Sequence, residues 1–354
     1  MEYCRLGGSG LEVSRLALGA IPFGTGLDAK TCGRLLDVFL DAGGNLVDTS
    51  NFYGGGMRGN NEEMAGTSER TLGDLIKGKR DRVVLASKGY WLMGNEVRPN
   101  TVGLSRTYLR ENINNSLKRL QTDHIDLYQF HSWDFYTPVE ESLYVLDEAI
   151  RDGKILYYGM SNWDGWHVVK AAQLAKSLGC PSPVSNQIWY NIADRTGDHS
   201  IIPACRDQNV SIIAWGALAE GFLTERYRQD RRPQPGTKLA GDVFKPGEMC
   251  EWDKLAIDRN WKTLYLLGDI AASHDTTIPI VAIRWLLQSG ACDVTLLGGS
   301  RLEHYVSNLE AAELELRDDE VERINESSKL PAPYPISFYD LFCRTDSEFY
   351  GGLR

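Results

Sequence analysis

Four side chains capable of acid–base chemistry follow three consecutive apolar runs of the sequence. Asp48 and Tyr53 come at and after the end of the first run, Lys88 ends the second and His131 ends the third. Each has a structural explanation of its own, because an aspartate often caps a helix, a lysine can reach out to solvent and a histidine is often a bonded core residue. If the runs are neighbouring strands, however, Lys88 is desolvated and needs an acid partner, and Asp48 is available.

Together these four residue types suit the delivery of a proton to a carbonyl oxygen. A free tyrosine has a pKa of about 10, which is too high for efficient acid–base work at neutral pH, and a nearby ammonium group favours the phenolate. We therefore expect Lys88 to lower the pKa of Tyr53, and Asp48 to keep Lys88 protonated. His131 would donate or accept a hydrogen bond at the reacting oxygen.

The elements that must position these residues form a repeat. Short runs rich in Val, Ile, Leu and aromatic residues alternate with longer amphipathic segments, which is the pattern of βα units around a parallel sheet. The predicted strands are 16–19, 45–48, 83–88, 125–131, 155–161, 184–187, 211–215 and 294–297. The predicted helices include 31–42, 105–120, 138–152, 163–178 and 261–273.

Eight such units favour a closed (β/α)₈ TIM barrel over an open doubly wound sheet. The first predicted strand leads into GAIPFG at 19–24 and not into G-x-G-x-x-G, which removes the main support for a dinucleotide-binding open sheet. We expect one barrel domain over 1–329. Its working groups should lie at the C-terminal ends of the strands.

Two segments lie outside the repeat. Residues 226–256, after the seventh strand, are long and rich in Pro and Gly, and we interpret them as a loop that covers a cofactor; the alternative is a tolerated surface insertion. The tail 330–354 carries too many aromatic residues for a free end. We expect it to lie near the substrate pocket; the alternative is packing against the outer helices.

Composition excludes several classes of function. The net charge is 38 − 48 = −10, which argues against nucleic-acid binding. Seven scattered cysteines without a C-x-x-C pair indicate a reducing compartment, and no leader or membrane span is evident, so we expect a cytoplasmic protein that does not bind membranes. The six histidines form no H-x-H or H-E-x-x-H motif, and no metal site is predicted.

Four stretches closely resemble the aldo-keto reductases, in particular the longer-chain, potassium-channel-β-like branch. They are GNLVDTSNFYG at 44–54, SKG at 87–89, IDLYQFH at 125–131 and GMSNW at 159–163. The resemblance extends from about residue 3 to 326. It implies a barrel that binds NADP(H) and reduces an aldehyde or ketone to an alcohol, or the reverse, with Tyr53 as proton donor.

The resemblance also implies the residues that bind the cofactor. Ser161, Asn162 and Gln187 would hold the nicotinamide carboxamide and Trp215 would stack on its ring. A second group would follow the pyrophosphate and the adenosine end: Gly216, Ala217, Leu218, Gly221, Arg226, Gly298, Ser300, Arg301, His304 and Asn308, with Gly19 and Asp48 nearby. The sequence departs from the family at His304, where Gln is common, and at Ser307, where an acid is common.

The substrate is not specified by these motifs. Phe23, Trp91, Trp133 and Tyr190 follow strand ends and are candidate substrate-binding residues. They would suit an aromatic carbonyl, and dicarbonyls and ketosugars remain open. A non-catalytic, cofactor-sensing role like that of the channel β subunits is the alternative function; it is expected to need a partner surface or an N-terminal extension, for which the short segment before the first motif leaves no room. Oligomeric state and reaction direction are not predicted.

Overall fold

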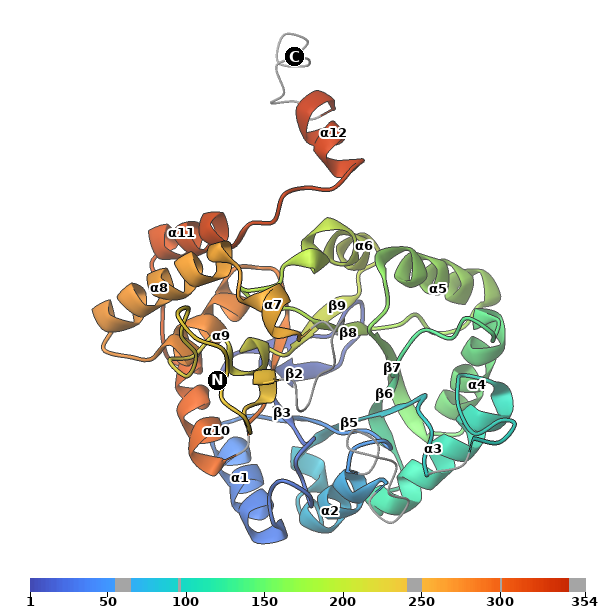
Figure 1. The fold of residues 1–354 in the computed structure, drawn as a ribbon. Helices are drawn as coiled ribbons and strands as arrows, with labels where there is room; N and C mark the ends of the chain where they lie inside the picture. Colours follow the sequence, from blue (N-terminus) through green and yellow to red (C-terminus); the bar gives the residue numbers. More distant parts are fainter. Residues whose placement is uncertain (55–64, 95–96, 241–249, 300, 344–354) are drawn as a thin grey trace.

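A closed barrel of eight parallel strands forms the centre of the molecule (Figure 1). The computed structural model describes residues 1–54, 65–94, 97–240, 250–299 and 301–343. The barrel strands follow one another in sequence order, and the last pairs with both the first and the second-to-last to close the ring. They are β3 (Leu16–Gly19), β4 (Leu46–Asp48), β5 (Val84–Gly89), β6 (Ile125–Phe130), β7 (Ile155–Ser161), β8 (Ser185–Trp189), β9 (Ser211–Trp215) and β10 (Val294–Leu297).

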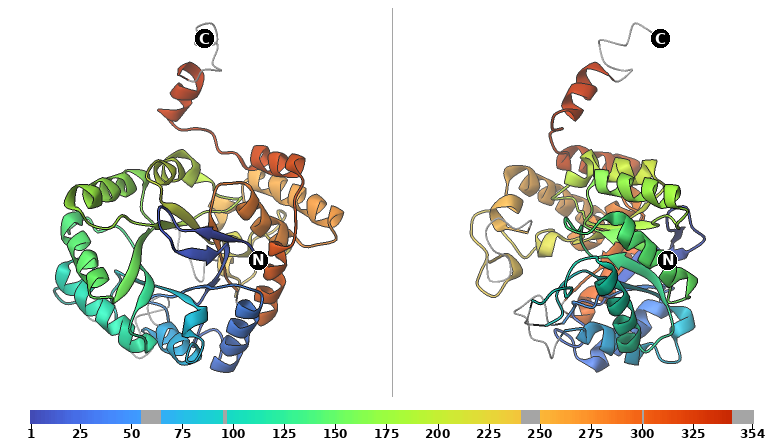
Figure 2. Two further views of the ribbon diagram at one scale, coloured as in Figure 1. Left: turned by 180° about the vertical axis from the view of Figure 1, so that it is seen from behind. Right: turned by 90° about the vertical axis from the view of Figure 1, so that its right-hand side faces the viewer.

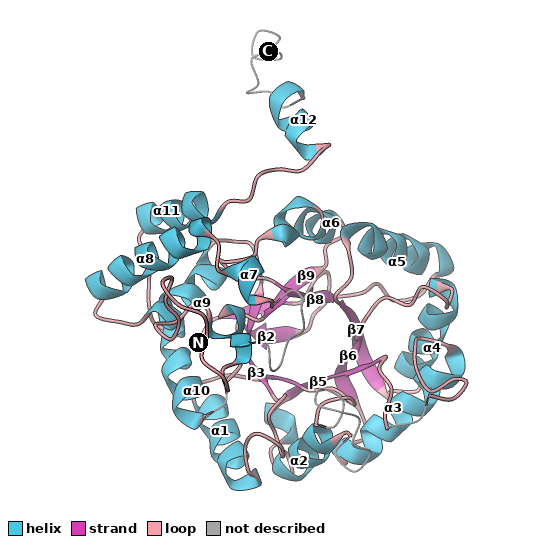
Figure 3. Ribbon diagram, viewed as in Figure 1, coloured by secondary structure: helices cyan, strands magenta, loops and turns pink. Residues whose placement is uncertain are grey.

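The (β/α)₈ TIM barrel predicted from the sequence is therefore confirmed. Each of the eight predicted strands is present, with ends that differ from the prediction by two residues at most. The strands are short and almost wholly buried because the helices cover the outer face of the barrel and side chains fill its inside (Figure 3).

Helices surround the barrel on all sides, except for the last one, which projects away from it (Figure 1). They are α1 (Ala29–Asp41), α2 (Thr67–Leu75), α3 (Arg106–Leu120), α4 (Val139–Arg151), α5 (Gly165–Leu178), α6 (Ile201–Asp207), α7 (Trp252–Leu255), α8 (Asp258–Ser273), α9 (Ile278–Gln288), α10 (Leu302–Leu309), α11 (Asp318–Ser328) and α12 (Ile336–Phe342). Short 3₁₀ turns lie at Arg80–Arg82, Thr196–His199, Ala219–Gly221, Lys238–Ala240 and Glu310–Ala312.

Helix α1 illustrates how the sequence sets an element's ends. The carboxylate of Asp28 caps the helix by accepting a hydrogen bond from the Thr31 N–H at 2.9 Å. A stripe of buried apolar residues, including Leu36 and Phe39, faces the barrel. The helix stops just before Gly43, whose φ of +85° continues the chain in a conformation that glycine adopts at little cost.

An antiparallel hairpin, which the sequence analysis missed, closes the N-terminal end of the barrel. It consists of β1 (Tyr3–Arg5) and β2 (Glu12–Ser14), and it crosses the back of the barrel in Figure 2. Leu6 and Val13 of this segment are fully buried against a cluster of inward-facing strand residues, which comprises Ala17, Leu46, Ala86, Leu127, Val184, Ile213 and Val294. The N-terminal half of the barrel is thus an apolar plug.

The segment after β9 is held to the barrel by aromatic packing. Phe222 and Trp252 both contact Trp261 of α8, with ring centroids 4.9 and 5.9 Å away, and Tyr227 lies 5.6 Å from Trp252. Residues 241–249 of the expected cofactor-covering loop lie outside the described residues. The described residues of this loop pack against α8.

The C-terminal tail does not lie where we expected it. Residues 329–335 lead away from α11, and α12 projects from the side of the barrel (Figures 1 and 2). Tyr334 is 82% exposed and Leu341 65% exposed. Three prolines at 331, 333 and 335 remove backbone donors from the connecting segment, and the backbone hydrogen bonds of α12 among the described residues are local. The expectation that the tail lies at the substrate pocket is wrong for 330–343; residues 344–354 lie outside the described part.

None of the helices in the described part of the chain is both long and apolar enough to cross a membrane.

Candidate active site

The C-terminal half of the barrel interior carries polar residues directly above the apolar plug. Successive side chains of a strand point to opposite faces, so the residue two positions after an inward-facing one also points inward. Asp48 follows Leu46 in this way, Lys88 follows Ala86, and Gln129 follows Leu127. The register pairs Lys88 with Gln129 and Asp48 with Ala86 on adjacent strands. The alternation therefore points all three polar side chains into the barrel, with Lys88 and Gln129 one inward-facing position beyond Asp48.

Lys88 is the centre of this group. Its ammonium nitrogen is fully buried and donates to three acceptors, which are the carboxylate of Asp48, the carbonyl oxygen of Thr49 at 3.0 Å and the hydroxyl of Tyr53 at 3.0 Å. An ammonium group has three protons to donate, so every donor is satisfied. The nitrogen also lies 4.8 Å from the centre of the Tyr53 ring. The structure thus joins Asp48, Lys88 and Tyr53 in one network.

Two glutamines hold the other oxygen of Asp48. Its Oδ1 accepts from Gln129 Nε2 at 3.0 Å and from Gln187 Nε2 at 2.8 Å. Hydrogen bonds of this kind stabilise a buried carboxylate in its charged form. The sequence analysis did not single out Gln129, although its position two residues after a core leucine could have identified it.

Charge and burial set the protonation states of the pair at the centre. Burial raises the pKa of the Tyr53 phenol above its ordinary value, and Lys88 offsets this only in part. Burial alone would lower the pKa of Lys88, but the Asp48 carboxylate and Tyr53 outweigh it and raise that pKa. Lys88 is therefore a cation and Tyr53 a neutral phenol at neutral pH. Lys88 does lower the pKa of Tyr53 by its own charge, as we expected. The expected net shift is wrong, however, because the increase caused by desolvation is larger than the decrease caused by Lys88.

His131 joins the group from the loop after β6. Its ring lies edge-on to that of Tyr53, with centroids 5.8 Å apart, and its Nδ1 is 3.1 Å from Ser50 Oγ. Burial, together with the nearby Lys88 cation, lowers the pKa of His131 well below the ordinary value. The imidazole is therefore neutral at neutral pH. All four predicted acid–base residues meet at one place.

Aromatic rings border this group on the solvent side. Phe52 lies 6.0 Å from Trp91 and 6.5 Å from His131, and Trp91 lies 6.3 Å from His131, measured between ring centroids. Trp91 is 40% exposed and Phe52 is half-buried. The predicted residue Trp91 is thus next to the four, and Phe52, which the sequence analysis missed, completes the apolar border.

The other three candidate substrate residues lie elsewhere. Phe23 and Tyr190 are fully buried and have no surface that a substrate can reach. Tyr190 stacks on Trp285 of α9, with centroids 6.2 Å apart, and its hydroxyl donates to Asp198. Trp133 stacks on His167 at 3.8 Å and is nine-tenths buried. The expectation that Phe23 and Tyr190 line the mouth is wrong, and Trp133 packs against α5.

The residues expected at the nicotinamide end lie together at the ends of β7, β8 and β9. Asn162 adopts a left-handed conformation with φ of +61°. Its amide nitrogen donates to Ser161 Oγ at 3.0 Å, and its amide oxygen accepts from Trp215 Nε1 at 3.1 Å. Gln187 is tied to Asp48, as described above. Hydroxyl and amide groups beside a half-exposed indole ring are groups that fit a planar carboxamide.

The chain turns sharply after β9, where the pyrophosphate residues are expected. Gly216 has a φ of +72°, and a Cβ there would lie 2.3 Å from the ring of Trp189. Ala219 and Glu220 also have positive φ, and Lys238 lies 2.5 Å from the Glu220 carboxylate. Ala217 is buried, Leu218 and Gly221 are half-buried, and Arg226 is exposed. The turn is held by its own backbone, since the N–H groups of Ala219 and Gly221 donate to the carbonyl oxygens of Gly216 and Leu218 at 2.8 and 2.9 Å.

The expected adenosine residues lie around the start of α10. Arg301 and His304 are exposed, Asn308 is buried, and Ser300 lies outside the described residues. Arg301 is the residue before the first helical turn, and among the described residues no side chain caps that end. Gly298 is open, since a Cβ there would meet nothing within 4 Å, whereas a Cβ at Gly19 would lie 3.0 Å from the Leu297 carbonyl oxygen. An uncapped helix start beside an arginine is suited to an anion.

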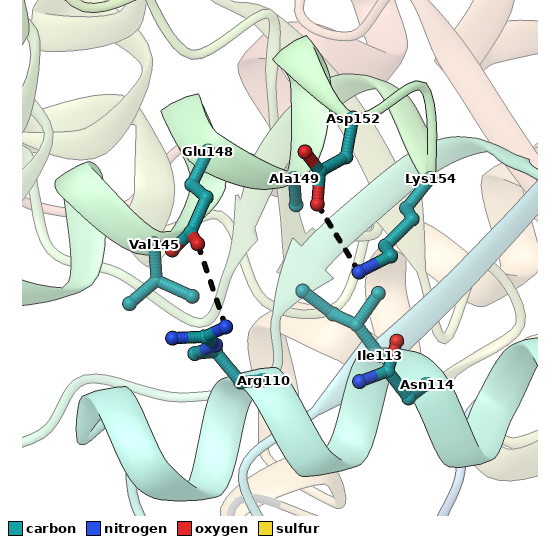
Figure 4. Close-up of a pocket in the computed structure, with 8 residues that line it drawn as sticks. All are labelled: Arg110, Ile113, Asn114, Val145, Glu148, Ala149, Asp152 and Lys154. Carbon is teal, nitrogen blue, oxygen red and sulfur yellow. Dashed lines mark ion pairs between the residues drawn. The ribbon is translucent and has the colours of Figure 1, made fainter.

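Two further features bear on binding. A shallow depression lies between α3 and α4, and ion pairs cross it from Arg110 to Glu148 at 3.5 Å and from Lys154 to Asp152 at 3.2 Å (Figure 4). The charges in this depression are paired with one another.

Among the described residues, no three His, Cys, Asp or Glu side chains are arranged to hold a metal ion.

Comparison with known proteins identifies the class to which this barrel and its polar centre belong. The model of the aldo/keto reductase family matches residues 15–329, and the chain belongs to that family. The resemblance noted in the sequence is thereby confirmed, and the protein is an oxidoreductase of a family that uses a nicotinamide cofactor.

Three relatives share most of their length with this chain. An uncharacterized oxidoreductase, YrpG, of Bacillus subtilis (strain 168) is 34% identical over 331 residues, which span 92% of this chain and 95% of the relative. An aryl-alcohol dehydrogenase (NADP(+)) of Phanerodontia chrysosporium is 30% identical over 354 residues, 94% of this chain and 87% of the relative. A probable voltage-gated potassium channel subunit beta of Oryza sativa subsp. japonica is 30% identical over 316 residues, 89% of this chain and 92% of the relative.

Proposed function

We propose that the protein is an NADP(H)-dependent oxidoreductase that reduces an aldehyde or ketone to an alcohol, or catalyses the reverse, with Tyr53 as the proton donor. The observation that carries the proposal is the position of the buried Lys88 ammonium, which lies between the Asp48 carboxylate and the Tyr53 hydroxyl. Burial of a charged lysine costs on the order of several kcal/mol of solvation free energy, as for other ions, unless an opposite charge and hydrogen bonds compensate for the loss. Such an arrangement is expected where the phenol has to lose a proton.

The roles of the chain's own residues follow from the protonation states. When bound, the cofactor supplies or accepts the hydride at the carbonyl carbon. Tyr53, which is a neutral phenol, gives its proton to the oxygen that becomes negative. Lys88 stabilises the phenolate that Tyr53 becomes, and Asp48 keeps Lys88 charged. His131 is neutral and holds the same oxygen by a hydrogen bond.

The preference for NADP(H) is supported by the start of α10. We expect the 2′-phosphate to lie against the free N–H groups of this helix, next to the exposed cation Arg301. The printed name of the Phanerodontia chrysosporium relative includes NADP(+). We expect the remaining cofactor residues, from Ser161 to Asn308, to border the same face of the barrel.

An aromatic carbonyl compound is the substrate class that we propose. Phe52 and Trp91 form the apolar border beside Tyr53 and His131, and ring–ring contacts of this kind favour flat aromatic molecules. The name of the same relative refers to an aryl alcohol.

Cys32, Cys205 and Cys292 are buried, free thiols, which is in line with our expectation of a cytoplasmic enzyme that acts on a small molecule.

A non-catalytic, cofactor-sensing role is the second candidate, and the rice relative named as a potassium channel subunit favours it. The two candidates differ in turnover. An enzyme consumes many equivalents of NADPH in the presence of a good carbonyl, whereas a sensor oxidises at most the one equivalent that it binds. The complete set of Asp48, Tyr53, Lys88 and His131 supports the enzyme.

The test is a screen of NADPH oxidation against aromatic aldehydes, α-dicarbonyls and ketosugars, with Tyr53→Phe as the control. We expect multiple turnovers by the unmodified protein, with the highest kcat/KM for aromatic aldehydes, and little activity in the control. The absence of multiple turnover across the panel, or a preference for NADH, would contradict the proposal.

A further inference from the structure

The buried hydroxyl group of Ser50 contacts the imidazole ring of His131, and no backbone group of the described residues determines which nitrogen of that ring carries the proton. Ser50 lies in the loop after β4 and is fully buried, and its Oγ is 3.1 Å from Nδ1 of His131. The backbone of His131 is held separately, since its N–H donates to the Gly89 carbonyl at 3.1 Å and its carbonyl accepts from the Asn162 amide at 3.2 Å. Ser50 therefore acts on the imidazole ring itself.

The hydrogen bonds around Ser50 favour one direction for its proton. Its Oγ accepts from the Phe52 N–H at 3.2 Å, which leaves one O–H to donate. The nearest acceptor is His131 Nδ1 at 3.1 Å; the Asn51 amide oxygen is at 3.2 Å and the Lys88 carbonyl oxygen at 3.4 Å. That carbonyl already accepts from the Asn51 N–H at 3.2 Å. Donation to Nδ1 makes the shortest of the three contacts, and it does not share its acceptor with another donor, as donation to the Lys88 carbonyl would.

A neutral imidazole carries one proton, on either Nδ1 or Nε2. The pKa of His131 lies well below its ordinary value because the ring is buried and Lys88 is nearby, so the ring is neutral at neutral pH. If Nδ1 accepts from Ser50, the proton of the ring resides on Nε2. A ring with its proton on Nε2 is a hydrogen-bond donor at that atom, whereas the other tautomer presents a lone pair.

We propose that Ser50 is a positioning residue that holds His131 as the Nε2–H tautomer, so that His131 donates a hydrogen bond to the substrate carbonyl oxygen beside the Tyr53 hydroxyl. The inference rests on the proposed function, since it assigns a direction to a hydrogen bond of that reaction. A donor at Nε2 stabilises the negative charge that develops on the oxygen during reduction. The opposite tautomer would repel that charge.

The direct test is spectroscopic and needs no substrate. Correlation of ¹⁵N and ring ¹H signals in histidine-labelled protein distinguishes the two neutral tautomers, and a His131→Asn variant assigns the signals of this ring. We expect the unmodified protein to show the Nε2–H form, and Ser50→Ala to show a mixture or the Nδ1–H form. Either an Nδ1–H ring in the unmodified protein or an unchanged tautomer in Ser50→Ala would overturn the proposal.

A kinetic test separates positioning from a general loss of packing. We expect Ser50→Ala to lower kcat by about tenfold or more, within the range that one hydrogen-bonding or acid–base group contributes, with little change in KM. The matched control is Ser68→Ala, which also removes a fully buried hydroxyl, one that bonds to Thr49 Oγ1 at 2.8 Å and to the Ala20 carbonyl at 2.6 Å. The control should retain the unmodified kcat.

A double variant completes the test. If Ser50 acts only through His131, Ser50→Ala should cost nothing further in a His131→Ala background. Equal losses in both backgrounds would show a structural role and overturn the proposal. Failure of the proposed function would instead appear as an unmodified protein without turnover, while the tautomer measurement would still decide the role of Ser50.

Discussion

The ammonium nitrogen of Lys88 lies 3.0 Å from the hydroxyl of Tyr53, and both groups are buried. This contact pairs a cation with a neutral phenol, because burial raises the pKa of Tyr53 and the charge of Lys88 offsets only part of that rise. Tyr53 therefore stays protonated until it reacts, and the positive charge of Lys88 stabilises the phenolate that forms when the proton leaves.

Replacement of Tyr53 by phenylalanine should abolish turnover and leave cofactor binding nearly intact. The ring and its packing against His131 remain, and only the hydroxyl that Lys88 contacts is lost. We expect kcat to fall by about 10²-fold or more, measured on the best substrate of the panel, with an NADPH Kd within about twofold of the unmodified value. A variant that kept a tenth of its kcat would remove Tyr53 from the role of proton donor.

Replacement of Lys88 by methionine should reduce both activity and stability. The buried Asp48 carboxylate would lose its cation and keep only the amide groups of Gln129 and Gln187, and breaking a buried pair in this way typically costs about 3–5 kcal/mol. Urea unfolding measures the loss. Lys77→Met is the control, because it breaks the exposed pair with Asp74, which is worth about 0–1 kcal/mol. Equal losses in the two variants would contradict the buried charge pair.

The pH dependence of the two reaction directions should be opposite at high pH. The pKa of Tyr53 is raised, so the phenol stays protonated through neutral pH, and the rate of reduction should fall only as the pH rises through that raised pKa. Alcohol oxidation needs the phenolate and should accelerate over the same range. The pKa of His131 is well below its ordinary value, so no change is expected near pH 6.5. Profiles of kcat measured in both directions test this, and a rate of reduction that changes around pH 6.5 would contradict it.

Much of the site could be predicted because it belongs to the strands. Asp48 and Lys88 end apolar runs, and the alternation of a strand fixes the face that they share with the core residues two positions earlier. The same alternation explains an error: Trp189 and Gln187 lie on one face of β8, whereas Tyr190, one residue further on, turns to the outer helices and stacks on Trp285.

The remaining features depend on quantities that a sequence pattern does not contain. Ser50 and Phe52 lie in a loop, where no periodicity assigns a direction to a side chain, and both were missed. The net direction of the Tyr53 pKa shift depends on the balance between desolvation and the charge of Lys88, and only the folded structure supplies that balance. The tail was misplaced because its aromatic residues suggested a binding partner within the chain, whereas the described part of α12 is exposed.

Replacement of Arg301 by alanine should weaken NADPH binding selectively. Charge-assisted hydrogen bonds to a phosphate contribute about 1.5–3 kcal/mol, so we expect the NADPH Kd to rise about 10- to 100-fold and the NADH Kd to change little. Fluorescence titration with both cofactors measures the two constants. Arg110→Ala serves as a control, because Arg110 lies in the depression between α3 and α4. Equal losses for NADPH and NADH would assign Arg301 to another role.

Deletion of residues 330–354 should leave catalysis unchanged. The described part of this tail leaves the barrel beyond α11, and Tyr334 and Leu341 are largely exposed, so its removal takes no described side chain from the border formed by Phe52 and Trp91. We expect kcat/KM to stay within about twofold of the full-length value for small and bulky aldehydes alike, because changes at exposed positions away from the site have small effects. Truncation before α11, after residue 317, is the contrasting variant. It would remove the fully buried Ile324 and the Asn325 side chain that accepts from the Trp285 indole, and it should lower Tm markedly. A KM that rose with substrate size on deletion of 330–354 alone would show that the tail reaches the pocket in solution and would contradict the exposed position of α12.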